Sequence, residues 1–168
     1  MTGPDPRPPS TDALPTLTGG VPHGFRETRA SRVVGRGARR FREAGDAVLA
    51  WQVHRGSGFV PVDVPPVVAV GAESAWLVTF GPLRPRVDCR VFAVVDEPRR
   101  TGFGHVALRG HPQSGWESYV VTWHPDDRVT LDVRVVWRPA AWWLRLVGPA
   151  SRVALALILR RNLRALDA

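Results

Sequence analysis

The residues best suited to chemistry lie between positions 102 and 121, in the stretch GFGHVALRGHPQSGWESYVV. It holds His105 and His111, two of the chain's five histidines, and Glu117 follows the second of them. An imidazole and a carboxylate can act as a general acid and base, and both can bind a metal ion. The same stretch also has the residue pattern of a β-hairpin that carries polar side chains. These residues therefore leave three interpretations to compare: a catalytic pair, a metal site and a hairpin.

The metal site is the weakest interpretation. Zinc needs three or four Cys, His or carboxylate ligands at compatible spacing, whereas most of a strand and half a turn would separate His105 from His111. We therefore expect no metal and no cofactor. Ser114 and Ser118 lie near His105 in the chain, but they do not form the sequence pattern of a nucleophile elbow. Proton transfer by His105 and Glu117 stays open as a hypothesis.

The hairpin interpretation sorts the side chains onto two faces. If the turn is centred near Pro112, His105 pairs with Tyr119 and Ala107 with Glu117. The alternation of side chains along a strand then gives one face these residues: Phe103, His105, Ala107, Glu117, Tyr119, Val121 and Trp123. Aromatic rings mixed with a few polar groups are typical of a small-molecule pocket. The opposite face is aliphatic with small hydroxyls.

A neighbouring strand supplies two further candidates, Arg90 and Phe92. Arg90 would provide the positive charge that a buried Glu117 needs, and a solvent-facing Glu117 is the alternative. The predicted ligand-binding set is Arg90, Phe92, Phe103, His105, Glu117 and Tyr119, and the loop of the motif comprises Gly110, His111, Pro112 and Gly115. We expect His111 to be a loop residue rather than a ligand.

The elements that position these residues follow from apolar periodicity. An extended segment is predicted for HGFRETRASRVVGRG. A helix is predicted from Ala38 to about His54, because its apolar residues recur at helical spacing. The stripe of this helix consists of Phe41, Ala44, Val48 and Trp51. RGSGFVPVDVPP is predicted as a loop, and short strands follow in VVAVGAESAWLVTF, RVDCRVFAVVDE, the hairpin and RVTLDVRVVWR. Consecutive short strands joined by turns predict an antiparallel sheet.

The chain is predicted to end in helices. RPAAWWLRLVG is interpreted as a short helix in which Trp142 and Trp143 either cover the pocket or form a partner surface. A longer helix opens near Pro149. Its apolar face carries Leu155, Ile158, Leu159, Leu163 and Leu166, opposite Arg160, Arg161 and Arg164. Because this apolar face must be buried against the sheet, the sequence predicts an α+β fold.

Length and composition favour one globular domain, residues 23–168, after a Pro-rich, disordered tail at residues 1–22. The single cysteine, Cys89, lies in an apolar run and is expected to be a buried thiol, which suits a reducing, cytoplasmic setting. Arginines break the apolar stretch near the C-terminus, so no transmembrane segment is expected. The net charge of +8, carried entirely by arginine, would attract nucleic acid or anionic lipid over long range.

Several stretches resemble a bacterial and plant family known as domain of unknown function 1990, or uncharacterised protein family 0548. They are VGRGARRFREAGDAVLAW, CRVFAVVDEPRRTGFGHVALRGHPQSGWESYVV, Arg138-Pro139 and RLVGPASRVALALILRRNLRAL, and they span about residues 23 to 166. Members usually have tyrosine at the position of His105, so the resemblance does not support imidazole catalysis there. They also usually have glutamate at the position of Trp116 and serine at that of Trp137. Arg90, His111, Gly115 and Glu117 match.

The order of elements is also similar to the helix-grip fold of the polyketide cyclase, START and Bet v 1 superfamily. This resemblance implies a curved antiparallel sheet that wraps a long C-terminal helix and leaves a cavity for an apolar ligand. Our first hypothesis is therefore a module that binds a small apolar or amphipathic molecule. The second is an enzyme in the same pocket, such as a cyclase, hydrolase or lyase. The third is an arginine-rich protein that interacts through its surface, although no specific nucleic-acid motif accompanies the arginines.

Overall fold

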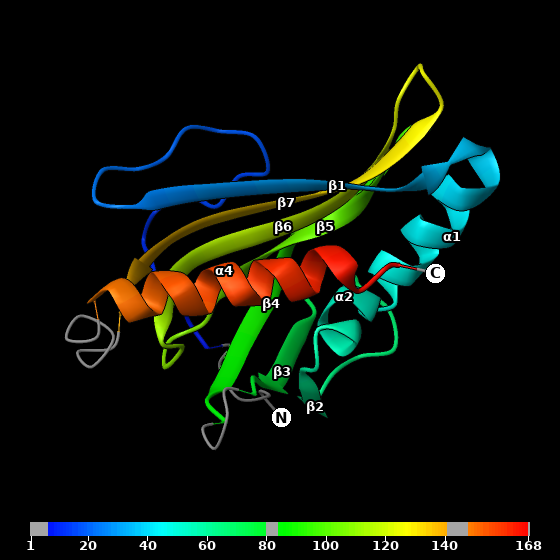
Figure 1. Ribbon diagram of the computed structural model, residues 1–168. Helices are drawn as coiled ribbons and strands as arrows, with labels where there is room; N and C mark the ends of the chain where they lie inside the picture. The colour runs from blue at the N-terminus through cyan, green and yellow to red at the C-terminus, as the bar shows by residue number, and fades with distance from the viewer. Residues whose placement is uncertain (1–6, 80–83, 141–147, 168) are drawn as a thin grey trace.

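The computed structural model describes residues 7–79, 84–140 and 148–167. Within these ranges, seven strands form one antiparallel sheet in the order β1-β7-β6-β5-β4-β3-β2. The strands are β1 (Arg26–Arg36), β2 (Val60–Asp63), β3 (Glu73–Leu77), β4 (Arg86–Glu97), β5 (Arg100–Ala107), β6 (Gln113–Trp123) and β7 (Arg128–Pro139), and the helices are α1 (Gly37–Leu49), α2 (Gln52–Gly56) and α4 (Gly148–Arg164). Figure 1 shows α4 crossing the curved sheet, with its C-terminal end beside α2. The predicted α+β helix-grip architecture is confirmed.

The core lies between the sheet and the helices, and the alternation of residues along β7 explains which face of the sheet is buried. Its alternating residues Val129, Leu131, Val133, Val135 and Trp137 are each at most 3% exposed. The apolar face of α4 packs onto the same cluster, as predicted, through Leu155, Ile158, Leu159 and Leu163, and Leu166 just after the helix joins it. Burying one such side chain contributes about 1.5–3 kcal/mol, so the two periodic patterns together fix which faces meet.

The helix predicted from Ala38 to His54 is two helices in the structure. Trp51 separates α1 from α2 and adopts a left-handed backbone conformation with φ of 64°. That conformation costs about 1–2 kcal/mol for a residue other than glycine. The Trp51 ring is fully buried and lies 5.1 Å from the Phe103 ring, centroid to centroid, so tertiary burial outweighs the local cost. Periodicity identifies the buried stripe but not the break.

Two strand predictions differ from the structure. The stretch predicted as a loop contains β2, an edge strand that pairs with β3 and accommodates Pro61 because one side of it needs no hydrogen bond.

β4 has an irregular register, with Val91 opposite His105 and Ala93 opposite Gly104. The extra residue reverses the alternation beyond Phe92. Val94 consequently lies opposite Phe103 and packs against the same core cluster as Val91.

Residues 7–22 pack against the face of the sheet that is opposite α4. The Ser10 amide donates to the carbonyl of Ala107 at 2.8 Å, and the Trp116 indole N–H donates to the carbonyl of Thr16 at 3.0 Å. The Pro-rich composition of residues 1–22 predicts a disordered tail. Composition indicates that this segment has little apolar surface of its own, but it does not reveal that donors on the sheet satisfy its backbone carbonyls.

Arg134 holds this segment and provides a test of its role. Its side chain is 7% exposed, and it donates to Glu27 Oε1 at 2.6 Å and to the carbonyls of Thr16 and Gly19. Arg134→Met should lower the free energy of unfolding by about 2 kcal/mol, because partly buried acceptors lose their donor. It should also make residues 7–22 sensitive to limited proteolysis.

The matched control is Arg29→Met. Arg29 donates to the same Glu27 carboxylate, but its side chain is 64% exposed. Its removal should change the free energy of unfolding by less than about 0.5 kcal/mol. Equal effects of the two substitutions in urea denaturation would contradict the assigned role of Arg134.

Candidate functional site

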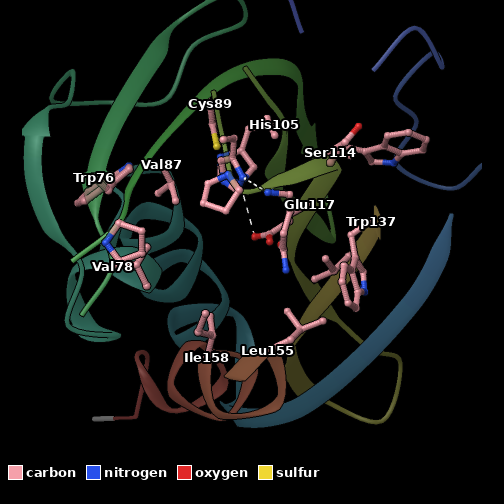
Figure 2. Close-up of a pocket in the computed structure, with 18 of the residues that line it drawn as sticks. Trp76, Val78, Val87, Cys89, His105, Ser114, Glu117, Trp137, Leu155 and Ile158 are labelled. Atoms are coloured by element: carbon pink, nitrogen blue, oxygen red, sulfur yellow. Dashed lines mark hydrogen bonds and ion pairs between the residues drawn. The ribbon is translucent and has the colours of Figure 1, made fainter. Parts of the chain in front are cut away.

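A pocket of about 730 Å³ lies between the sheet and α4. Such a volume suits a small organic molecule. Figure 2 shows Leu155 and Ile158 of α4 on one side of the pocket and His105 and Glu117 of the sheet on the other. Much of the wall is apolar, with contributions from Trp76, Val78, Val87, Cys89, Ala107, Val135, Trp137 and Ala154. The polar groups of the lining include His54, His111 and the exposed Arg84, besides His105 and Glu117.

A chain of polar contacts reaches from the pocket wall to α4. The Tyr119 hydroxyl donates to Glu117 Oε2 at 2.5 Å, and His105 Nε2 lies 3.6 Å from the same oxygen. Asn162 Nδ2 in turn donates to the Tyr119 hydroxyl at 3.3 Å. We call these four residues the Glu117 network. The network joins two strands to the C-terminal helix, so the position of the carboxylate is fixed by tertiary contacts.

The hairpin register explains why His105 and Glu117 meet. His105 lies directly opposite Glu117, and Phe103 lies opposite Tyr119. The predicted register differs from this by two residues, because β5 ends at Ala107 and β6 begins at Gln113. A shift of two keeps every side chain on the same face, since side chains alternate with a period of two. The predicted face is therefore correct, although the predicted partners are not.

Burial and hydrogen bonding act against each other on Glu117. Burial raises the pKa of the carboxyl, but the proximity of His105 Nε2 and the hydrogen bond from the Tyr119 hydroxyl outweigh burial and lower the pKa to about 2. Glu117 is therefore ionised near neutral pH. Its side chain is 26% exposed because it faces the pocket.

Two other histidines of the pocket remain neutral. Burial lowers the pKa of His54 to about 3, and burial lowers that of His111 to about 4. His54 stacks on the Trp76 ring with centroids 5.1 Å apart. His111 Nδ1 accepts a hydrogen bond from the Gln113 amide at 3.0 Å, which places the proton of the neutral ring on Nε2. Each imidazole is a hydrogen-bonding group without charge at neutral pH.

Two further groups near the pocket have raised pKa values. Burial raises the pKa of the Cys89 thiol, and burial together with the Glu117 charge raises that of the Tyr119 phenol. A buried thiol with a raised pKa is a poor nucleophile, and a general acid or base works best with a pKa near the operating pH. None of the shifts described for these groups brings a pKa closer to neutral pH.

The predicted site residues separate into three groups. His105 and Glu117 line the pocket. Phe103 and Tyr119 lie on the same face but are packed in the core behind them, each at most 1% exposed. Arg90 and Phe92 lie on the opposite face of the sheet. Phe92 packs there with the cluster of Val106, Trp116 and Val136.

The expected pairing of Arg90 with Glu117 is wrong. Arg90 Nη2 donates to Glu73 Oε1 at 2.6 Å and to the carbonyl of Arg7 at 2.5 Å. In the β4–β5 register Arg90 lies opposite Val106, whereas its neighbour Val91 lies opposite His105. Alternation thus turns Arg90 away from the pocket. His105, rather than an arginine, lies beside Glu117.

The motif loop forms the turn of the hairpin and part of the pocket wall, to which His111, Pro112 and Gly115 contribute. Gly110 and Gly115 both have positive φ, of 100° and 141°. Pro112 accepts a hydrogen bond from the Ala140 amide through its carbonyl. Ser114 Oγ donates to the carbonyl of Ser10, so this hydroxyl anchors the N-terminal segment. His111 is in the loop, as expected, and its side chain also lines the pocket.

Two buried polar residues of the site, His54 and Asn162, were not among the predicted site residues, although the helical patterns contain both. His54 follows Trp51 by three residues and therefore continues the buried stripe of the predicted helix. Asn162 lies on the apolar face of the last helix between Leu159 and Leu166 and is 1% exposed. A polar side chain on an apolar stripe signals a buried hydrogen bond, which here is made with Tyr119.

The described part of the chain holds no group of three or more His, Cys, Asp or Glu side chains that could bind a metal ion. No helix in the same ranges is long and apolar enough to cross a membrane. Trp142 and Trp143, in the short helix predicted before α4, lie outside the described residues.

Comparison with solved structures supports the fold. The hypothetical protein jhp0584 from Helicobacter pylori shares 11% identity with a TM-score of 0.59, and the match covers 92% of this chain and 98% of that one. Ginseng major latex-like protein 151 from Panax ginseng shares 10% identity with a TM-score of 0.55, over 89% and 99% of the two chains. Ara h 8.0201 shares 10% identity with a TM-score of 0.54, over 86% and 96%. These likenesses confirm the helix-grip resemblance and concern the fold alone.

The comparison with curated proteins finds no match. The family model for "Domain of unknown function (DUF1990)" matches residues 11–165, which include both strands of the hairpin and all of α4. The chain therefore belongs to the DUF1990 family.

Proposed function

We propose that this protein binds a small apolar or amphipathic molecule in the pocket between the sheet and α4. The observation that carries the proposal is a pocket of about 730 Å³ whose wall is largely apolar and includes the ionised Glu117. An apolar wall gains free energy when a ligand covers it, and a few polar groups orient that ligand. A cytoplasmic setting is part of the proposal, because the one cysteine of the sequence is a buried thiol.

The titration states support binding rather than turnover. A binding site needs groups that keep one protonation state while they hold a ligand. The ionised Glu117 and the neutral His54 and His111 meet this requirement. The first measurement is native mass spectrometry of gently purified protein, followed by denaturing extraction. A reproducible extra mass would support the proposal and reveal the chemical class of the ligand.

Two alanines on α4 allow the pocket to be filled selectively. Ala154 lines the pocket, whereas Ala156 is exposed on the other side of the helix. Ala154→Trp should weaken the binding of an apolar fluorescent probe, such as N-phenyl-1-naphthylamine, by about tenfold or more, because the indole occupies the ligand's space.

Ala156→Trp is the matched control, because it adds the same side chain to the same helix outside the pocket. Its probe affinity should equal that of the unmodified protein. Failure of the unmodified protein to bind any apolar probe would overturn the proposed function.

A further inference from the structure

The two oxygens of the Glu117 carboxylate differ in their contacts, because one accepts a hydrogen bond from the protein and the other does not. Oε2 accepts from the Tyr119 hydroxyl and faces His105 Nε2. Within the described residues, no donor forms a hydrogen bond with Oε1. The side chain lines the pocket and is 26% exposed. A carboxylate has about four lone-pair sites, so this one has unused acceptor capacity in the pocket.

The strand partners of Glu117 do not supply that missing donor. On one side its strand partner is His105, which already contacts Oε2, and on the other its partner is Val135, an apolar residue at 1% exposure. An ionised group beside hydrocarbon is costly unless it is hydrogen-bonded. A ligand that donates a hydrogen bond to Oε1 therefore gains more binding free energy in this pocket than a ligand that contributes only apolar surface.

The charges nearby indicate which kind of donor fits. A carboxylate or phosphate head group would meet the negative charge of Glu117, and the cation of the described lining, Arg84, is exposed. An ammonium group would stand beside His105, the basic side chain that already faces the carboxylate. A neutral hydroxyl adds a hydrogen bond without adding a charge of either sign.

We propose that the pocket selects an apolar molecule with a hydroxyl head group, and that this hydroxyl donates a hydrogen bond to Glu117 Oε1. This inference rests on the proposed function and specifies its ligand class. It assigns Glu117 as the residue that determines specificity. His105, Tyr119 and Asn162 act as positioning residues, because they hold the carboxylate through the contacts described above.

The test compares two ligands of nearly equal shape, 2-naphthol and 2-methylnaphthalene, by fluorescence titration. An apolar pocket without an acceptor prefers the methyl compound, because the hydroxyl gives up its hydrogen bond to water. In the unmodified protein we expect the opposite order, with 2-naphthol bound about fivefold more tightly, since a hydrogen bond to a charged acceptor is strong. Equal affinities, or tighter binding of 2-methylnaphthalene, would overturn the inference while leaving the proposed function intact. Binding of neither compound would overturn the proposed function.

Substitution of Glu117 provides the second part of the experiment. Glu117→Met has similar length and no acceptor, so it should reverse the order of the two affinities and leave 2-methylnaphthalene within about twofold of its original value. Retention of the 2-naphthol preference in this variant would contradict the role of Oε1. The control is Glu97→Met, which removes a carboxylate with a side chain 54% exposed and away from the pocket lining, and should keep the preference. If Glu117→Met does not fold, the comparison in the unmodified protein still decides the question.

Discussion

Gly115→Ala is expected to lower the free energy of unfolding by about 3 kcal/mol or more. Gly115 has φ of 141°, a conformation that side chains with a Cβ rarely adopt. A Cβ at this position would lie 2.0 Å from the Val136 carbonyl oxygen and 2.9 Å from the Trp137 Cα. Both obstacles are backbone atoms of β7, so relief requires the strands to separate. Backbone strain and overpacking each cost about 1–3 kcal/mol, and here they combine.

Gly110→Ala separates these two costs. Gly110 has φ of 100°, but a Cβ there would meet nothing within 4 Å. This substitution should therefore cost about 1 kcal/mol, from backbone strain alone. Urea denaturation of the two variants measures both values. A Gly115→Ala protein as stable as Gly110→Ala would contradict the close approach of β6 and β7.

Acidification from pH 7 to pH 5 is expected to destabilise the protein by about 2 kcal/mol through His54 alone. The pKa of His54 is about 3 in the folded protein, and its ordinary value is 6.5. The folded state thus keeps the ring neutral, while the unfolded state takes up a proton below 6.5. His54 supplies full stability above 6.5, and this contribution is lost as the pH falls from 6.5 toward 3.

Two further groups, His111 and Glu117, also lower the free energy of unfolding as the pH falls. The pKa of His111 is lowered to about 4, and that of Glu117 is lowered to about 2. His111 adds to the loss below 6.5, and Glu117 adds to it as the pH falls from 4.5 toward 2. Thermal or urea unfolding at several pH values measures the total slope. A stability that is constant between pH 7 and pH 5 would show that the buried imidazoles do not behave as described.

His54→Phe isolates the contribution of one imidazole. A phenyl ring preserves the aromatic contacts with Trp76 and Phe103 but cannot bind a proton. This variant should lose about 2 kcal/mol less than the unmodified protein between pH 7 and pH 5. His23→Phe, which removes an exposed imidazole, serves as the control. A pH dependence unchanged by His54→Phe would assign the acid sensitivity to other groups.

The periodic patterns determined much of the fold. Alternation in β7 and the helical stripe of α4 identified the two faces that form the core, because burial of apolar area depends mainly on which side of an element a residue occupies. The same reasoning placed His105 and Glu117 on one face even with a register two residues out. The family resemblance, carried by specific motifs, is also confirmed.

The break at Trp51 and the irregularity beyond Val91 were beyond the reach of periodicity. Each costs local free energy that only contacts with distant residues repay, such as Trp51 with Phe103 or Val94 with the core. The contacts of residues 7–22 have the same cause, because carbonyls of a polar segment meet donors that are a hundred or more residues away in the chain. A local pattern does not contain such partners.

The sequence by itself determined the fold class, the family and the placement of an imidazole and a carboxylate on one face of the sheet. Only the tertiary structure decided that Arg90 turns away to Glu73, that His54 and His111 join the pocket, and that Asn162 connects α4 to the Glu117 network. The physical reason is the distance along the chain over which each kind of information acts. Periodicity reports which face a residue occupies within its own element, whereas a binding site depends on which elements the packed chain brings together around one cavity.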